Sequence, residues 1–244
     1  MPEAVIFDLD GTLYRQEPLR RAMLIRLARA HAFRPLKGLR TARVLGAYRR
    51  AQEHLRDSAI VSEDLAGAQL RLACESGNAD PAFVTECVAR WMEQDPLEIL
   101  HRHIQPGLVD FLQECKQRGL RLGLFSDYPA DAKLTALGLD GLFDVVLTAQ
   151  SPGVGAFKPD PRGLLLVAER LGVSPDLCVY VGDRAAVDAA AAHSAGMASF
   201  ILAKRAKHNE HWTAVSGYAE LHERLFLAMP SQPPAAAQPS LDRR

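Results

Sequence analysis

The chain has 244 residues, 48% of them hydrophobic and 24% charged, so it can bury the core of one large domain or of a domain with a smaller insert. Its 29 basic and 29 acidic residues cancel, which argues against partners such as nucleic acid or an anionic membrane. The sequence lacks a signal-peptide pattern, the ~20 apolar residues of a membrane span and any CxxC pair, so we expect reduced thiols and a cytoplasmic protein.

The first predicted element is a buried strand over residues 4–7, a short apolar and β-branched run. From residue 17 to residue 103 the composition shifts to Arg, Ala and Leu at helical spacing. Helices are predicted near residues 20–33, 40–55, 63–74 and 81–92. In the first of them Met23, Leu24, Leu27 and Ala28 share an apolar face. This pattern predicts an all-helical insert after the first strand.

After Pro106 strands and helices alternate along the chain. Strands are predicted at 120–126, 143–148, 176–183 and 197–203, and helices at 107–119, 131–138, 161–172, 185–196 and 218–229. Such alternation predicts an α/β fold with a doubly wound parallel sheet. We therefore assign residues 1–16 and 104–229 to an α/β core domain and 17–103 to a helical domain. The Pro- and Ala-rich residues 230–244 are expected to form a disordered tail.

Two aspartates follow the first strand in the stretch VIFDLDGTLY. Asp8 and Asp10 point the same way, because side chains of a strand alternate between its faces. Two close carboxylates repel each other unless a cation lies between them, and oxygen ligands suit Mg²⁺. A second interpretation of this pair has Asp8 capping a helix and Asp10 solvated.

Further polar residues follow the other strands or lie in loops between them. Ser126 ends one predicted strand, Lys158 lies in a Gly- and Pro-rich loop, and Asp183 ends another strand with Asp188 in the next helix. Ligands of open α/β sheets bind at the carboxyl ends of the strands, so these side chains are expected to converge. This combination suits phosphoryl transfer, since it offers a carboxylate nucleophile, carboxylates that can bind a metal ion, a hydroxyl and a lysine.

These residues form four motifs that resemble those of the haloacid dehalogenase (HAD) superfamily, whose members are mostly phosphatases. The motifs are DLDGT from Asp8 to Thr12, Ser126 in LFSD, Lys158 in FKPD, and Asp183 to Asp188 in GDRAAVD. The resemblance covers residues 2–202 and puts the helical insert where this family has a helical cap. It implies a Rossmann-like HAD core and a Mg²⁺-dependent phosphatase that acts on a small phosphorylated metabolite.

The resemblance also implies a role for each matching residue. Asp8 is the expected nucleophile and forms an aspartyl-phosphate, and Asp10 is the expected general acid and base. Asp8, the backbone carbonyl of Asp10 and Asp183 are expected to bind Mg²⁺. Ser126 and Lys158 are expected to hold the phosphate, while Asp188 orients Lys158 or a metal-bound water. Asp10 argues against dehalogenation, because members that remove halide lack an aspartate at that position.

Two residues depart from the motifs of this family. Asp127 stands where Asn is usual, and we expect its backbone N–H, rather than its side chain, to face the substrate phosphate. Arg184 stands where a small residue is common, and it either pairs with Asp127 or another acid or is solvated. Two alternatives to a phosphatase stay open: a phosphomutase using the same site, and a non-catalytic binding or regulatory protein.

The arginines of the insert have two interpretations. Arg15, Arg20 and Arg21 either meet an anionic group of the substrate or lie on a solvated helix face. A second group is expected to be solvated: Arg40, Arg43, Arg49, Arg50 and Arg56. Trp91 and Trp212 are expected to be packing residues.

Overall fold

The computed structural model of the chain describes residues 1–203 and 211–227. The strands are β1 Ala4–Phe7, β2 Arg121–Ser126, β3 Val145–Thr148, β4 Cys178–Gly182, β5 Ala198–Leu202 and β6 Thr213–Val215. The helices are α1 Gln16–Ala30, α2 Pro35–Asp57, α3 Leu65–Gly77, α4 Pro81–Val88, α5 Leu97–Leu100, α6 Leu108–Gln117, α7 Asp131–Leu137, α8 Arg162–Leu171, α9 Ala190–Ser194 and α10 Tyr218–His222. The predicted tail at 230–244 lies outside the described residues.

Three short π-helical segments accompany these helices. They are Ala89–Gln94 after α4, Ala185–Ala189 before α9, and Glu223–Leu227 after α10. Within the described residues no helix is long and apolar enough to cross a membrane.

The six strands form one sheet in the order β3-β2-β1-β4-β5-β6, and every neighbouring pair is parallel. This confirms the predicted α/β fold with a doubly wound parallel sheet. The chain leaves central β1 for β2 on one side and later returns to β4 on the other, which makes a crevice at the carboxyl ends of these strands. The sequence did not predict β6, a three-residue edge strand that pairs with β5.

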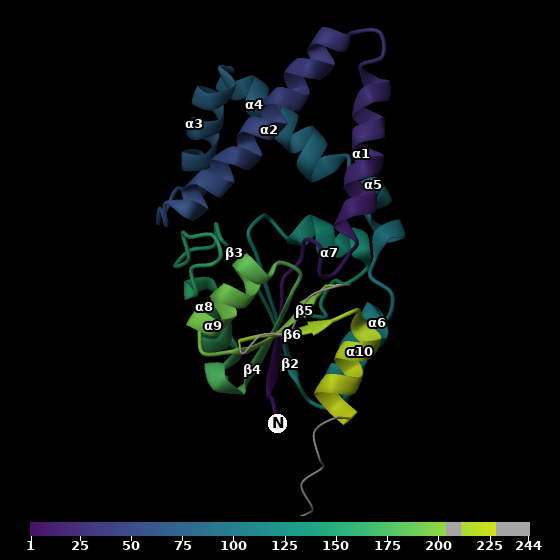
Figure 1. The fold of residues 1–244 in the computed structure, drawn as a ribbon, viewed down its shortest axis with the longest axis vertical. Coiled ribbons are helices and arrows are strands. Elements are labelled where there is room, and N and C mark those ends of the chain that lie inside the picture. The colour runs from purple at the N-terminus through teal and green to yellow at the C-terminus, as the bar shows by residue number, and fades with distance from the viewer. Residues whose placement is uncertain (204–210, 228–244) are drawn as a thin grey trace, which may run out of the picture.

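Helices cover both faces of the sheet (Figure 1). Along β1, Val5 and Phe7 pack into a cluster with α6 and α10, whereas Ala4 and Ile6 pack on the opposite face with α8 and α9. This alternation with a period of two residues places all four side chains of β1 in apolar surroundings. The strand therefore carries no polar residue until it ends, at Asp8.

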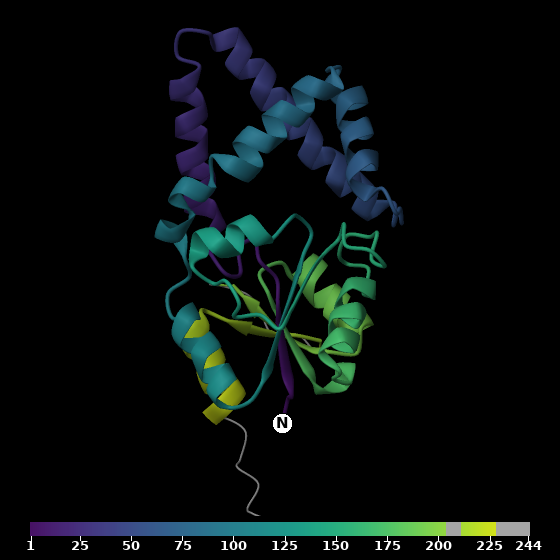
Figure 2. The same ribbon diagram turned by 180° about the vertical axis from the view of Figure 1, so that it is seen from behind.

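All elements between β1 and β2 are helical, and helices α1 to α4 stand above the carboxyl ends of the strands, whereas α6 lies against the sheet (Figure 2). Asp64 and Asp80 fix the starts of α3 and α4, because their carboxylates accept hydrogen bonds from backbone N–H groups of the first turn. Helices α2, α3 and α4 share an apolar cluster that includes Val44, Ala73 and Val84. The boundaries assigned to the two domains from the sequence stay predictions.

The apolar face predicted for helix α1 is only partly covered in the structure. Met23 and Leu27 are half-buried, but Ala28 is exposed and the Leu24 side chain is 69% exposed. Among the described residues of α1 only Leu19, close to the core, is buried. Both ribbon views show α1 standing apart from α3 and α4 (Figures 1 and 2). Met23, Leu24 and Leu27 instead line a cavity between the insert and the core.

Candidate active site

The ends of the three central strands bring the predicted site residues together. Asp8 follows β1, Ser126 ends β2 and Asp183 follows β4, and these strands are neighbours in the order β2-β1-β4. Lys158 comes from the loop between β3 and α8, and Asp188 from the π-helical segment after β4. Parallel strands present their carboxyl ends at one edge, so residues far apart in sequence meet there.

Asp8 is buried and both of its carboxylate oxygens have partners. Oδ1 pairs with the ammonium group of Lys158, and Oδ2 accepts a hydrogen bond of 3.1 Å from the hydroxyl of Thr12. Burial raises the pKa of Asp8 well above its ordinary value; the charge of Lys158 opposes this rise, while the charges of Asp188 and Asp183 add to it. The carboxylate thus lies in a strongly negative cluster with one lysine as counter-charge.

Lys158 is the cation at the centre of this cluster. Besides Asp8, its ammonium group contacts Asp188 Oδ1 at 2.8 Å and the Tyr180 hydroxyl at 3.0 Å. Burial alone would lower the pKa of Lys158, but the charges of Asp188 and Asp8 outweigh it and raise the pKa. Lys158 is therefore protonated at neutral pH, with a fixed ammonium group that faces the site.

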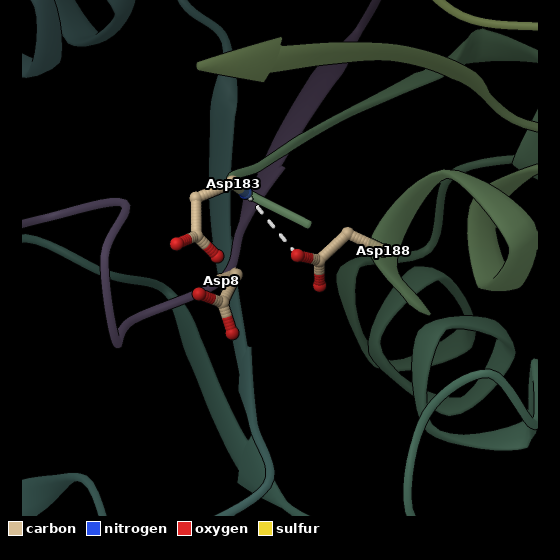
Figure 3. A group of neighbouring side chains, drawn as sticks. All are labelled: Asp8, Asp183 and Asp188. Atoms are coloured by element: carbon tan, nitrogen blue, oxygen red, sulfur yellow. Dashed lines mark hydrogen bonds between the residues drawn. The ribbon is translucent and has the colours of Figure 1, made fainter. Parts of the chain in front are cut away.

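Asp188 holds its neighbours in place (Figure 3). Its Oδ2 accepts hydrogen bonds from the backbone N–H groups of Asp183 at 3.2 Å and Arg184 at 2.9 Å, while Oδ1 contacts Lys158 and the Tyr180 hydroxyl. One carboxylate thereby fixes both the turn after β4 and the lysine. Burial tends to raise the pKa of Asp188, but Lys158 and these hydrogen bonds lower it overall.

Asp10 lies apart from this group and has its own partners. Its Oδ1 accepts hydrogen bonds from the Tyr14 hydroxyl at 2.5 Å and from the Lys133 ammonium group at 2.6 Å. Burial would raise the pKa of Asp10, but the charge of Lys133 and these two hydrogen bonds hold it below its ordinary value. Asp10 is consequently ionised at neutral pH in the free protein.

Three carboxylates make a site that fits a divalent cation. Asp8, Asp183 and Asp188 each offer an oxygen within 4.8 Å of the other two, and Figure 3 shows the carboxylates of Asp8 and Asp183 close together. Burial and the charge of Asp188 raise the pKa of Asp183 to about 7, a sign of negative charge that Lys158 does not fully offset. Oxygen-only donors of this kind suit Mg²⁺.

Gly11 allows the chain to pass close to this carboxylate group. Its backbone has a φ of +100°, and a Cβ atom at this position would lie 2.0 Å from Asp183 Oδ2. Any larger residue would therefore displace the carboxylate as well as strain the backbone. The Gly of the DLDGT motif is explained by this close approach.

A cavity of about 940 Å³ joins these residues to the helical insert. The core contributes Asp8, Asp10, Lys133 and Asp183 to its lining, and the insert contributes Arg20, Arg21, Tyr48, Arg49 and Trp91. Its volume is at the upper end of that usual for small-molecule sites. The predicted carboxylates thus face a space that can receive a ligand of metabolite size.

Comparison with known proteins identifies the family. The sequence model of haloacid dehalogenase-like hydrolases matches residues 2–196. The chain belongs to this family. It is 32% identical over 212 residues to a phosphoglycolate phosphatase of Rhodospirillum rubrum, covering 83% of this chain and 80% of that protein. It is 29% identical over 216 residues to a glyceraldehyde 3-phosphate phosphatase of Methanopyrus kandleri, covering 86% of this chain and 87% of that protein.

A solved structure supports the same assignment. The crystal structure of a HAD phosphatase from Thermococcus onnurineus matches with a TM-score of 0.63 and 26% identity, and the match covers 92% of this chain and 98% of that one. The resemblance to the HAD superfamily predicted from the four motifs is confirmed, and the chain is a hydrolase of this family. The roles assigned to single residues stay predictions.

The two departures from the HAD motifs have partners in the helical insert. Asp127 Oδ2 pairs with Arg56 Nη2 at 2.8 Å, and Asp127 Oδ1 accepts a hydrogen bond of 3.2 Å from the backbone N–H of Lys158. Arg184 does not pair with Asp127; its guanidinium lies 3.6 Å from Glu53 of α2. The expectation that Arg56 is solvated was wrong, because it reaches from α2 into the core and is buried. The four other arginines of that group are exposed.

One predicted residue of this HAD site lies where expected, and two others were missed from the sequence. Ser126 was predicted and is buried, with its hydroxyl accepting a 3.2 Å hydrogen bond from the Tyr128 backbone. Lys133 and Tyr180 were not predicted. Lys133 follows the Ser126 motif in the first turn of α7, a position from which a side chain can reach the same sheet edge. Tyr180 lies inside β4 with the appearance of a core aromatic, so the sequence carried no signal for its contacts with Lys158 and Asp188.

Proposed function

We propose that the protein is a Mg²⁺-dependent phosphatase that hydrolyses a small phosphorylated metabolite through an aspartyl-phosphate on Asp8. The observation that carries this proposal is the position of Asp8. Its carboxylate lies at the end of central strand β1, beside the ammonium group of Lys158 and the carboxylate of Asp183, and faces the cavity. The phosphatases among the relatives of this chain support the same reaction class.

In the first step an Asp8 carboxylate oxygen attacks the phosphorus atom of the monoester. The bond between phosphorus and the leaving oxygen breaks, and the leaving oxygen takes a proton from Asp10. In the second step Asp10 accepts a proton from a water molecule, which attacks the same phosphorus atom. The bond to Asp8 then breaks and inorganic phosphate is released. Each step is a single displacement, easier than direct hydrolysis.

The surroundings of Asp10 suit a residue that first donates and then accepts a proton. In the free protein Lys133 and Tyr14 keep its pKa low, so it is ionised and ready to act as a base. A phosphate group with two negative charges that arrives beside Asp10 would raise this pKa, because like charges disfavour the ionised form. Substrate binding would therefore load Asp10 with the proton that the leaving oxygen needs.

The remaining residues hold the phosphoryl group. The hydroxyl of Ser126, the backbone N–H of Asp127 and the ammonium group of Lys158 would donate to its oxygens. Asp8, Asp183 and the backbone carbonyl of Asp10 would bind Mg²⁺, which when present neutralises charge on the phosphoryl oxygens. Asp188 would act through its contacts with Lys158 and with the backbone of Asp183.

Phosphate release from a panel of phosphorylated metabolites tests the proposal. Wild type and Asp8→Asn would be compared with Mg²⁺ and with a chelator. We expect release that needs both Mg²⁺ and Asp8, and the ranking of substrates would identify the preferred metabolite. Transfer of phosphate within a substrate without release would indicate a phosphomutase, and folded protein inactive on every substrate would contradict the proposal.

A further inference from the structure

The last turn of α2 reaches from the helical insert into the core through Arg56. Its side chain is only 4% exposed, so its charge needs partners. The guanidinium pairs with Asp127 Oδ2 at 2.8 Å, donates through Nε to the backbone carbonyl of Lys158 at 2.7 Å, and contacts Glu53 within α2. A buried arginine with two partners in the core holds α2 against the core more firmly than an exposed ion pair would.

Arg56 and Asp127 together hold the backbone of Lys158 from both sides. Arg56 binds its carbonyl oxygen, while Asp127 Oδ1 accepts the hydrogen bond of its N–H at 3.2 Å. The side chain that leaves this backbone places its ammonium group against Asp8 and Asp188. A shift of the Lys158 backbone would therefore move the ammonium group relative to the nucleophile.

Other contacts bring the insert onto the same loop. The backbone N–H of Ser62 donates to the carbonyl of Gly155 at 2.8 Å, and a Cβ on Gly155 would lie 2.6 Å from the Ser62 carbonyl oxygen. An apolar cluster joins the insert to the core through Leu55, Leu65, Ala149 and Phe157. The loop that carries Lys158 is thus covered by the end of α2 and the start of α3.

We propose that Arg56 and Asp127 are positioning residues that make the location of Lys158 depend on the seating of the helical insert. When α2 is seated, the Lys158 backbone is fixed and its ammonium group lies between Asp8 and Asp188. When the insert moves away, Arg56 leaves with it, and the loop loses one of its two holds. Closure of the helical insert over a ligand would thereby place the Lys158 ammonium group in the active site. It also explains why Asp stands at position 127.

The inference rests on the proposed function for its kinetic consequence, but its structural consequence can be measured without any activity. The variants are Arg56→Ala and Arg56→Lys, with Arg50→Ala as the control. Arg50 is exposed on the same helix and has no ion pair among the residues that the structure describes. Hydrogen exchange of peptides that span residues 149–160 reports the hold on the loop, with peptides from β1 and β4 as internal references.

We expect exchange across residues 155–158 to be roughly tenfold faster in Arg56→Ala, with β1 and β4 unchanged and Arg50→Ala like wild type. In the phosphatase assay, kcat/KM should fall about 100-fold, as expected when a catalytic group is misplaced by about 1 Å. Arg56→Lys should lie between wild type and Arg56→Ala, because the single nitrogen of an ammonium group cannot reproduce the planar fork in which Nε and Nη2 donate to separate acceptors.

Unchanged exchange in residues 155–158 would overturn the inference, as would faster exchange throughout the protein, which would indicate a merely structural role. If Arg56→Ala does not fold, Asp127→Asn, which keeps its shape but weakens both bonds, gives the same comparison. A wild-type protein without phosphatase activity would contradict the proposed function alone, since the exchange measurement still decides the coupling.

Discussion

Replacing Lys158 with methionine tests whether its ammonium group is the counter-charge of the buried acids. The Lys158 side chain is 3% exposed, and its partners Asp8 and Asp188 are 7% and 1% exposed. Methionine fills similar space without a charge, so the variant leaves two buried carboxylates unpaired. Removal of one partner of a buried ion pair costs about 3–5 kcal/mol. We expect the free energy of unfolding to fall by about this amount at pH 8 in chelator.

The pH dependence of this loss follows from the pKa of Asp8. Burial already raises that pKa in the folded protein, and without the opposing charge of Lys158 it rises further. The folded variant then binds protons at a pH where the unfolded chain has released them, so its stability falls as the pH rises and partly returns toward pH 5. Urea denaturation at pH 5 and pH 8 measures both effects.

Lys116→Met is the matched control for this experiment. Lys116 lies 3.9 Å from Asp144, and both side chains are substantially exposed, so this pair contributes less than about 1 kcal/mol. Equal losses in the two variants, or a loss in Lys158→Met that does not depend on pH, would refute the reasoning about the buried cluster.

Three further predictions concern the neighbours of Asp8. Lys133→Ala removes the charge that lowers the pKa of Asp10, so the effect of burial dominates and this pKa rises. The limb of the pH profile of kcat/KM that reports Asp10 should therefore move to higher pH. Lys133→Arg, which keeps the charge, should retain the wild-type profile. Gly11→Ala places a Cβ 2.0 Å from Asp183 Oδ2, so Mg²⁺ affinity measured by calorimetry should fall at least about tenfold. Because the pKa of Asp183 is about 7 and that of Asp8 is also raised, protons compete with Mg²⁺ for these carboxylates. Wild-type Mg²⁺ affinity should therefore rise at least about tenfold from pH 6 to pH 8, and Asp183→Asn should weaken this dependence.

Much of the fold could be predicted because its signals are local. Strand β1 is a short apolar run, and the helices that follow each core strand have helical spacing, so the parallel sheet was expected. Strand β6 was missed, because three residues at a sheet edge carry too little pattern. For α1 the periodicity showed an apolar face, but it could not show that part of this face lines a cavity and does not pack against another helix.

Some residues of the site could likewise be grouped from the sequence, whereas others could not. Asp8, Ser126 and Asp183 could be grouped because the ends of parallel strands meet at one edge. The partners of Arg56 could not be predicted, since Arg56 and Asp127 lie 71 positions apart in the chain. The helical pattern of α2 also favoured a solvated arginine at this position. Tyr180 illustrates the same limit, because only the packed structure shows that its hydroxyl meets Lys158 and Asp188.

The central claim, that Asp8 accepts the phosphoryl group, is tested most directly by trapping the intermediate. Wild-type protein and Mg²⁺ would be mixed with the best substrate of the panel, quenched with acid within the first turnover and reduced with borohydride, which converts an aspartyl-phosphate into homoserine. Our account predicts homoserine at position 8 in the digested peptide and none in the Asp8→Asn variant. Phosphate release without modification at Asp8, or modification at another carboxylate, would contradict it.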